Sequence, residues 1–183
     1  MSSTGFDRDK IIELLTELGC RLSAKGVAGR LYIVGGAAMA LEFDTRRTTR
    51  DIDAVMHPPT TVADEAASMA RDLGLPLGWL SSAAQAFIPL PDEDPVSFDV
   101  EGLQVAVSSA ANLLAMKMAA GRPQDITDLV VLFAHLKIRS PEQAVDMAER
   151  MYGGDLVVLG EPRESLLLLA ESVLARMPAS KDR

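Results

Sequence analysis

The chain has 183 residues, with 18 Lys or Arg against 26 Asp or Glu, and therefore a net charge of −8. A hydrophobic fraction of 48% supplies a core for one domain or two small lobes and excludes a wholly disordered chain. Cys20 is the single cysteine, which excludes an internal disulfide and a cysteine-based zinc cluster. The apolar runs are too short to cross a bilayer and the N-terminus lacks the apolar stretch of a secretion signal, so we expect a cytoplasmic protein with no membrane partner.

The first half of the chain alternates helical and strand patterns. Apolar residues at helical spacing, or a composition rich in Ala, Met and Leu, predict helices over residues 8–22, 37–43 and 62–73. Short apolar or alternating runs predict strands over residues 31–34, 51–56, 96–100 and 103–107. The stretch 74–95 carries no clear pattern.

The second half is helical throughout. Helices are expected over residues 110–120, 125–137, 141–152 and 165–176. The sequence therefore predicts an α+β fold, in which residues 1–107 form a lobe built on a small mixed β-sheet. Residues 108–183 are expected to form a helical lobe of the same compact, bilobed unit.

The sharpest local feature is Gly35-Gly36 at the end of one expected strand, followed by Asp51-Ile52-Asp53 on the next. Alternation in a strand places Asp51 and Asp53 on one face, with Cα atoms roughly 6–7 Å apart. Two such carboxylates can hold a hard divalent cation, and the glycine pair lets a phosphate approach backbone N–H groups closely. The combination suits Mg²⁺ and a nucleoside triphosphate (NTP), although the D-x-D tripeptide is also common on solvated strands.

The loop before these carboxylates is basic. Arg46, Arg47 and Arg50 can neutralise the phosphates of an NTP or of RNA, so the acidic net charge does not exclude an RNA-acting enzyme. The alternative is an exposed loop whose arginines pair with Asp44 and Glu42. Function is the interpretation we adopt, because the loop directly precedes the D-x-D strand.

Two segments of the sequence resemble a known family. The segment IVGGAAMALEFDTRRTTRDIDAVM resembles the first motif of the polymerase-β-like nucleotidyltransferase superfamily, with a glycine pair, a short helix and D-x-D on the next strand. Its R-x-T-x-D-I-D portion is similar, more specifically, to the AbiEii/MenT toxin branch. The segment LLAMKMAAGRPQDITDLVVL resembles that branch's later motif, a Lys on one helix followed by D-x-x-D at the start of the next. The two segments cover about a quarter of the chain and occur in the family's order.

The later motif also has a physical reading. Lys117 shares a largely apolar helix face with Leu113 and Leu114, and a buried ammonium needs a partner. Either Lys117 contacts phosphate, or it snorkels, with its head group reaching water. Asp125 and Asp128 lie on one face of the next helix, but Asp125 could be that helix's N-cap, so Asp128 is the stronger site candidate.

The resemblance implies specific roles. The catalytic residues would be Asp51, Asp53, Lys117 and Asp128. The nucleotide would be bound by Gly35, Gly36, Arg47, Thr49, Arg50 and Lys117. The metal ligands would be Asp51, Asp53 and, as a third carboxylate on a later strand, Asp99, unless Asp99 is merely solvated and Asp128 takes its place. The acceptor would be bound by Arg46, Arg47 and Arg122.

The implied function is that of an Mg²⁺-dependent nucleotidyltransferase toxin. It would transfer NMP from an NTP to the 3′ end of tRNA, release pyrophosphate and block aminoacylation, and a cognate antitoxin would neutralise it. Two alternatives stay open. One is an enzyme that modifies a protein hydroxyl (AMPylation) or a small-molecule hydroxyl. The other is a non-catalytic antitoxin or binding module that retains the nucleotidyltransferase fold.

Overall fold

The computed structural model describes residues 5–89, 91–154 and 161–178. Contacts within the chain divide it into two compact units. Unit 1 comprises residues 1–87 and 94–108, and unit 2 comprises residues 88–93 and 109–183. No helix in the described ranges combines the length and the apolar character needed to span a membrane.

Unit 1 is built on a five-stranded mixed sheet with the order β3-β2-β1-β5-β4. The strands are β1 (Gly29–Val34), β2 (Ile52–His57), β3 (Leu80–Ser81), β4 (Val96–Val100) and β5 (Leu103–Val107). Strand β1 runs antiparallel to β2 and parallel to β5, while β2–β3 is parallel and β4–β5 antiparallel. The central strand β1 therefore carries the glycine pair at its carboxyl end.

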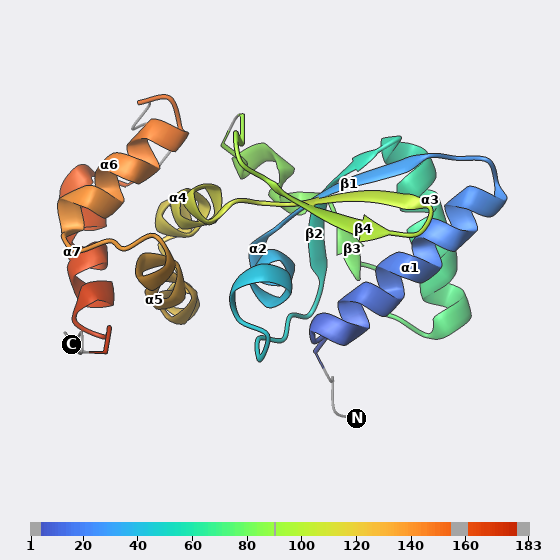
Figure 1. The fold of residues 1–183 in the computed structure, drawn as a ribbon, viewed down its shortest axis with the longest axis horizontal. Coiled ribbons are helices and arrows are strands. Elements are labelled where there is room, and N and C mark those ends of the chain that lie inside the picture. The colour runs from blue at the N-terminus through green and yellow to red at the C-terminus, as the bar shows by residue number, and fades with distance from the viewer. Residues whose placement is uncertain (1–4, 90, 155–160, 179–183) are drawn as a thin grey trace. The chain divides into compact units, whose positions relative to one another are not determined.

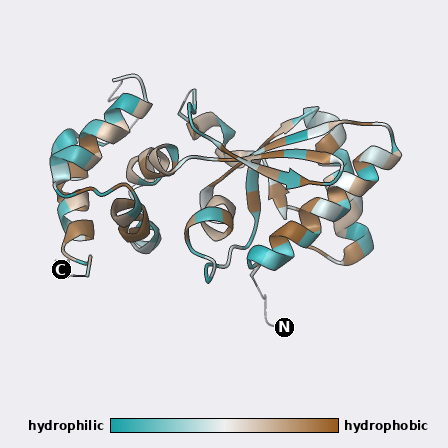
Figure 2. Ribbon diagram, viewed as in Figure 1, coloured by the Kyte–Doolittle hydropathy of each residue, from teal (hydrophilic) through white to brown (hydrophobic). Residues whose placement is uncertain are grey.

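Two long helices, α1 (Arg8–Ala24) and α3 (Pro59–Leu73), pack against the sheet (Figure 1). The strands alternate apolar and polar residues (Figure 2), and the apolar set is buried against these helices. Helix α1 approaches the β4–β5 turn closely, because a Cβ on Gly19 would lie 2.2 Å from the Glu101 carbonyl oxygen. Gly102 in that turn has a φ of +73°, a conformation that other residues rarely adopt. One face of the sheet is thus the core of unit 1.

A short helical segment follows β1. It begins as α2 (Gly35–Ala38) and continues as the π-helical turn η1 (Met39–Phe43). Its Ala and Met side chains are buried, which agrees with the helix expected from their composition. Helix α1 is tied to this segment by a hydrogen bond of 3.2 Å from Arg8 Nε to the Leu41 carbonyl.

Unit 2 is helical. It contains α4 (Ala110–Ala120), the 3₁₀ turn η3 (Pro123–Asp125), α5 (Ile126–His135), α6 (Pro141–Met151) and α7 (Arg163–Leu174). Ser109 caps α4 and Ser140 caps α6, each accepting a hydrogen bond from a backbone N–H three residues on. Arg163 donates hydrogen bonds to Asp146 and Glu149, which join α7 to α6 and raise the pKa of its guanidinium.

The α+β class and the mixed sheet expected from the sequence are confirmed. The stretch 74–95, which has no clear pattern, contains the two-residue strand β3 and the 3₁₀ helix η2 (Ala83–Phe87). Cys20 lies on the exposed side of α1. Strand β2 begins at Ile52, so Asp51 lies in a bend just before it and is exposed.

Candidate functional site

The glycine turn and Asp53 lie together at one end of the sheet in unit 1. Asp53 is the register partner of Val34, the last residue of β1. Gly35 follows with a φ of +66°, and a Cβ built on it would lie 3.4 Å from Asp53 Oδ2. The half-buried Asp53 carboxylate therefore faces the glycine turn, as the sequence requires for a metal and phosphate site.

Thr49 packs against the second glycine. A Cβ on Gly36 would lie only 2.7 Å from Thr49 Oγ1, and this hydroxyl donates a hydrogen bond of 3.0 Å to the Asp51 carbonyl. The Thr49 backbone is itself fixed, because it exchanges two hydrogen bonds with Phe6 at 2.6 and 2.9 Å. The loop that precedes Asp51 is thus anchored on one side to the glycine turn and on the other to the N-terminal segment.

This packing predicts that Gly36→Ala is harmful although Gly36 lies in a helix. The short, branched Thr49 side chain is held by its backbone and cannot swing away, so we expect a loss of about 1–3 kcal/mol in unfolding free energy. Gly78→Ala is the matched control, because nothing lies within 4 Å of its Cβ position. Urea denaturation of both variants measures the difference, and equal stability would contradict the packing.

The arginine loop is exposed in part. Arg46 has 93% of its side chain exposed and lies 3.7 Å from an Asp44 carboxylate oxygen, while Arg50 is exposed and Arg47 half-buried. The Arg46–Asp44 pair agrees with the exposed-loop alternative, but so open an ion pair contributes little and leaves Arg46 accessible. Both interpretations of the loop therefore remain compatible with its geometry.

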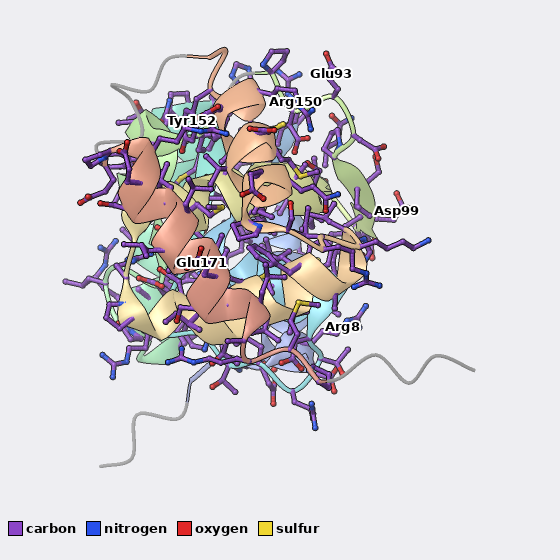
Figure 3. The ribbon with its side chains drawn as sticks, turned by 90° about the vertical axis from the view of Figure 1, so that its left-hand side faces the viewer. Arg8, Glu93, Asp99, Arg150, Tyr152 and Glu171 are labelled. Carbon is purple, nitrogen blue, oxygen red and sulfur yellow. The ribbon has the colours of Figure 1, made fainter. Side chains whose placement is uncertain are left out.

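Asp99 does not lie beside Asp53. It is exposed on β4 (Figure 3) and pairs with Gln104, whose own partner on β1 is Arg30. Arg30 is opposite His57, four residues along β2 from Asp53. Asp99 is therefore three strands across and roughly 13 Å along the sheet from Asp53, too far for a shared ion. The register disfavours the prediction that Asp99 is the third ligand.

In unit 2 Lys117 forms the centre of a buried ion cluster. Its Nζ donates to Asp125 Oδ1 at 2.8 Å and to Asp128 Oδ2 at 2.7 Å, and Arg122 Nε donates to Asp125 Oδ2 at 2.8 Å. Lys117, Asp125 and Asp128 are at most 5% exposed, whereas the Arg122 side chain is 59% exposed. Two cations and two carboxylates balance, so the cluster is neutral and joins α4 to α5.

The cluster corrects two readings of the sequence. Snorkelling is wrong, because the Lys117 ammonium is buried and binds carboxylates rather than water. Asp125 makes no side-chain cap bond to α5 and instead binds Lys117 and Arg122. The segment Pro123-Gln124-Asp125 has the local pattern of a helix N-terminus, which is why it suggests a cap. The contact of Asp125 with Lys117, eight residues earlier, depends on tertiary packing, which the local pattern does not show. Asp128, the stronger candidate from sequence, is in the cluster as well.

Sequence reasoning also missed Tyr32 and Ser108. The Tyr32 hydroxyl donates a hydrogen bond of 3.0 Å to Ser108 Oγ, joining β1 to the residue after β5. Tyr32 lines a groove of about 970 Å³, which also includes Ser23 of α1, and alternation along β1 puts the Tyr32 side chain on the sheet face opposite the buried Leu31 and Ile33. Alternation along β2 puts Asp53 on this same face, beyond Val55 and His57, which also line the groove.

The residues at the glycine turn supply only part of the coordination shell that Mg²⁺ needs. Among the residues that the structure describes, no three His, Cys, Asp or Glu side chains are grouped to hold a metal. Mg²⁺ commonly takes one or two carboxylates and completes its shell with water and substrate phosphates. Asp53, with Asp51 two residues before it, offers hard oxygen ligands of that kind, so the donor set suits an ion that arrives with a triphosphate.

The chain is similar to known proteins. Residues 9–138 match the model of the family described as "Nucleotidyltransferase of unknown function (DUF6036)". No curated protein matches the chain. The crystal structure of an antigenic nucleotidyltransferase-like protein from Paracoccidioides brasiliensis is similar at 16% identity and a TM-score of 0.48, over 86% of this chain and 95% of that chain. Because the family model spans well over half of its length, the chain belongs to the DUF6036 family of nucleotidyltransferases.

Proposed function

We propose that the protein transfers NMP from an NTP to the 3′-terminal hydroxyl of tRNA, as the resemblance to AbiEii/MenT toxins implies. The observation that carries the proposal is the Asp53 carboxylate held against the Gly35 turn. A Cβ built on Gly35 would lie only 3.4 Å from Asp53 Oδ2. A carboxylate beside a glycine turn suits a triphosphate and its cation, and the DUF6036 family assignment supports the transfer chemistry.

The reaction makes and breaks one bond at phosphorus. The acceptor oxygen bonds to the α-phosphorus, the bond from this phosphorus to the bridging oxygen breaks, and pyrophosphate leaves with the electron pair. The hydroxyl proton passes to solvent. Mg²⁺, when bound, would supply charge neutralisation on the phosphates, and Asp53 and Asp51 are the residues that would hold it. Gly35 and Gly36 would admit the phosphates, and Thr49 would keep the Asp51 loop in place.

Growth inhibition is the expected consequence in cells. A tRNA with added nucleotides cannot be aminoacylated, so the protein would act as the toxin of a toxin–antitoxin pair, with a neighbouring antitoxin as its partner. The buried Lys117–Asp125–Asp128 cluster joins α4 to α5 within unit 2, and a role for Lys117 in transfer is proposed from the motif that this segment resembles. Lys117 acts in this proposal as a positioning residue.

The decisive experiment incubates the purified protein with Mg²⁺, total tRNA and each α-labelled NTP in turn. Label in lengthened tRNA is the expected result. Label in a protein band would replace the proposal by AMPylation, and label in a small-molecule product would indicate a metabolite acceptor. No transfer to any acceptor, with intact NTP binding, would favour the non-catalytic binding module.

The basic loop gives a second test of the tRNA acceptor. We expect Arg46→Gln to reduce the slope of log K for tRNA binding against log salt by about 0.7–0.9, because one phosphate contact is lost. The fold should be unaffected, since the side chain is 93% exposed. Arg71→Gln, an exposed arginine on α3, is the matched control. A raised KM for NTP with an unchanged salt slope would place Arg46 on the triphosphate instead.

A further inference from the structure

The groove lined by Tyr32 begins close to the proposed site in unit 1. Three successive rows of side chains follow the register of β1 and β2. Asp53 lies in the first row, Tyr32 and Val55 in the second, and Arg30 and His57 in the third. Tyr32, Val55, Arg30 and His57 all line the groove, whereas Asp53 does not, so the groove begins one row of side chains away from Asp53.

Tyr32 presents an aromatic ring whose position is fixed by a hydrogen bond. Its ring is half-buried, and its hydroxyl is bonded to Ser108, which is fully buried and whose N–H in turn donates to the Ile33 carbonyl at 2.9 Å. The bond directs the phenol toward the end of the sheet that carries Gly35. As a diagonal neighbour of Asp53 across the β1–β2 pair, Tyr32 has its Cα roughly 7–8 Å from that of Asp53.

Arg30 supplies positive charge at the far end of the groove. It is exposed on the middle strand, and within the described part of the chain its guanidinium makes no ion pair or hydrogen bond. His57 lies directly opposite it on β2. An aromatic ring followed by an accessible cation is the arrangement that binds a base and then a backbone phosphate of a single strand.

The direction of attack at phosphorus determines on which side of Asp53 the acceptor lies. In nucleotidyl transfer the attacking and leaving oxygens are roughly in line at phosphorus. If the triphosphate lies on the Gly35 turn, its pyrophosphate leaves toward that turn. The acceptor oxygen must then approach from the opposite side of Asp53, which is the side of Tyr32 and Val55.

We propose that this groove is the acceptor subsite, in which Tyr32 stacks on the 3′-terminal base of a single-stranded RNA and Arg30 contacts a phosphate behind it. The inference rests on the proposed function for its chemistry, but binding of the strand does not require transfer. The groove of about 970 Å³ has room for the end of a strand. Tyr32 and Arg30 then determine which acceptors enter, while Asp53 and the glycine turn handle the NTP.

The experiment measures binding without NTP, by fluorescence anisotropy of a short 5′-labelled oligoribonucleotide that ends in CCA with a free 3′ hydroxyl. We expect Tyr32→Leu to weaken binding by about 5- to 100-fold, the range for loss of one base–aromatic stack. Tyr32→Phe keeps the ring and should stay within about threefold of the wild type. Binding of a fluorescent NTP analogue should be unchanged in both variants.

Arg30→Gln provides an independent readout that does not disturb the core. Its salt slope for the oligoribonucleotide should fall by about 0.7, the value for one phosphate contact on a single strand, while Arg71→Gln leaves the slope unchanged. If Tyr32→Leu does not fold, the Arg30→Gln slope decides. Unchanged oligoribonucleotide binding in the folded Tyr32 and Arg30 variants would overturn the subsite, and weaker binding of the NTP analogue alone would assign the groove to the NTP's nucleoside. If the wild type binds the strand in this way but transfers nothing, the subsite stands and the proposed function fails.

Discussion

Asp53→Asn is expected to abolish nucleotide transfer, with a loss of at least about 100-fold in kcat/KM for NTP. Mutating even a residue that contacts a metal ligand, and not the metal itself, lowers activity by about 10- to 100-fold. Loss of a direct ligand should therefore have a larger effect. The amide has the shape of the carboxylate but lacks its charge, and the space beside Gly35 stays filled. The measurement is transfer of α-labelled nucleotide to tRNA at saturating Mg²⁺, together with the melting temperature.

The control for this variant is Asp64→Asn, which removes an exposed carboxylate on α3. It should transfer at the wild-type rate, because α3 packs on the face of the sheet opposite the groove. Asp51→Asn tests the bend before β2 in the same assay, and a smaller loss than for Asp53 would identify Asp53 as the main ligand. Wild-type transfer by Asp53→Asn would remove the site from the glycine turn altogether.

The elements that the sequence predicted well are those formed by local contacts. The hairpin over Val96–Val100 and Leu103–Val107 has the predicted bounds, because its alternation and its two-residue turn are both encoded within twelve residues. Helix α4 likewise begins after its Ser109 cap and ends at Gly121, as its composition indicates. Strand β3 escaped prediction, since two residues show no period and its pairing with β2 spans a long stretch of chain.

The candidate site was predictable only where its motif is contiguous. Asp53 and Gly35 come together because adjacent strands bring the end of β1 beside the start of β2, which a strand–turn–strand pattern already implies. The Tyr32–Ser108 bond joins residues 76 positions apart and depends on the parallel pairing of β1 with β5. Nothing in the amino-acid pattern around Tyr32 signals that pairing, so the groove required the structure.

Lys117→Met is the second change with a large expected effect. On a merely apolar helix face, a Met would leave stability equal or higher. The ammonium instead binds Asp125 and Asp128, each at most 3% exposed. Its removal takes one cation from two buried carboxylates and breaks a contact with each of them. We expect a loss of about 3–5 kcal/mol in unfolding free energy, measured by urea denaturation.

A double variant separates charge imbalance from lost packing. In Lys117→Met/Asp128→Leu the cluster is reduced to Asp125 and Arg122, which keep their 2.8 Å contact and balance in charge. Because replacing a buried pair by apolar groups of similar volume is often neutral, most of the lost stability should return. If the double variant stayed as unstable as Lys117→Met, packing around the lysine stem and not its charge would be responsible.

The same pair of variants tests whether the cluster only joins helices or also positions the site. Both variants lack the ammonium, but only the double variant is expected to be well folded. If Lys117 acts on transfer through the fold alone, the double variant should recover kcat together with its stability. If Lys117 or Asp128, which are both replaced in this variant, acts as a positioning residue, kcat for tRNA extension should stay low in the stable double variant while the KM for NTP changes little. We expect the second pattern, since the motif that Lys117 belongs to resembles one that works beside the D-x-D carboxylates, and a stable double variant with the wild-type kcat would assign the cluster to stability alone.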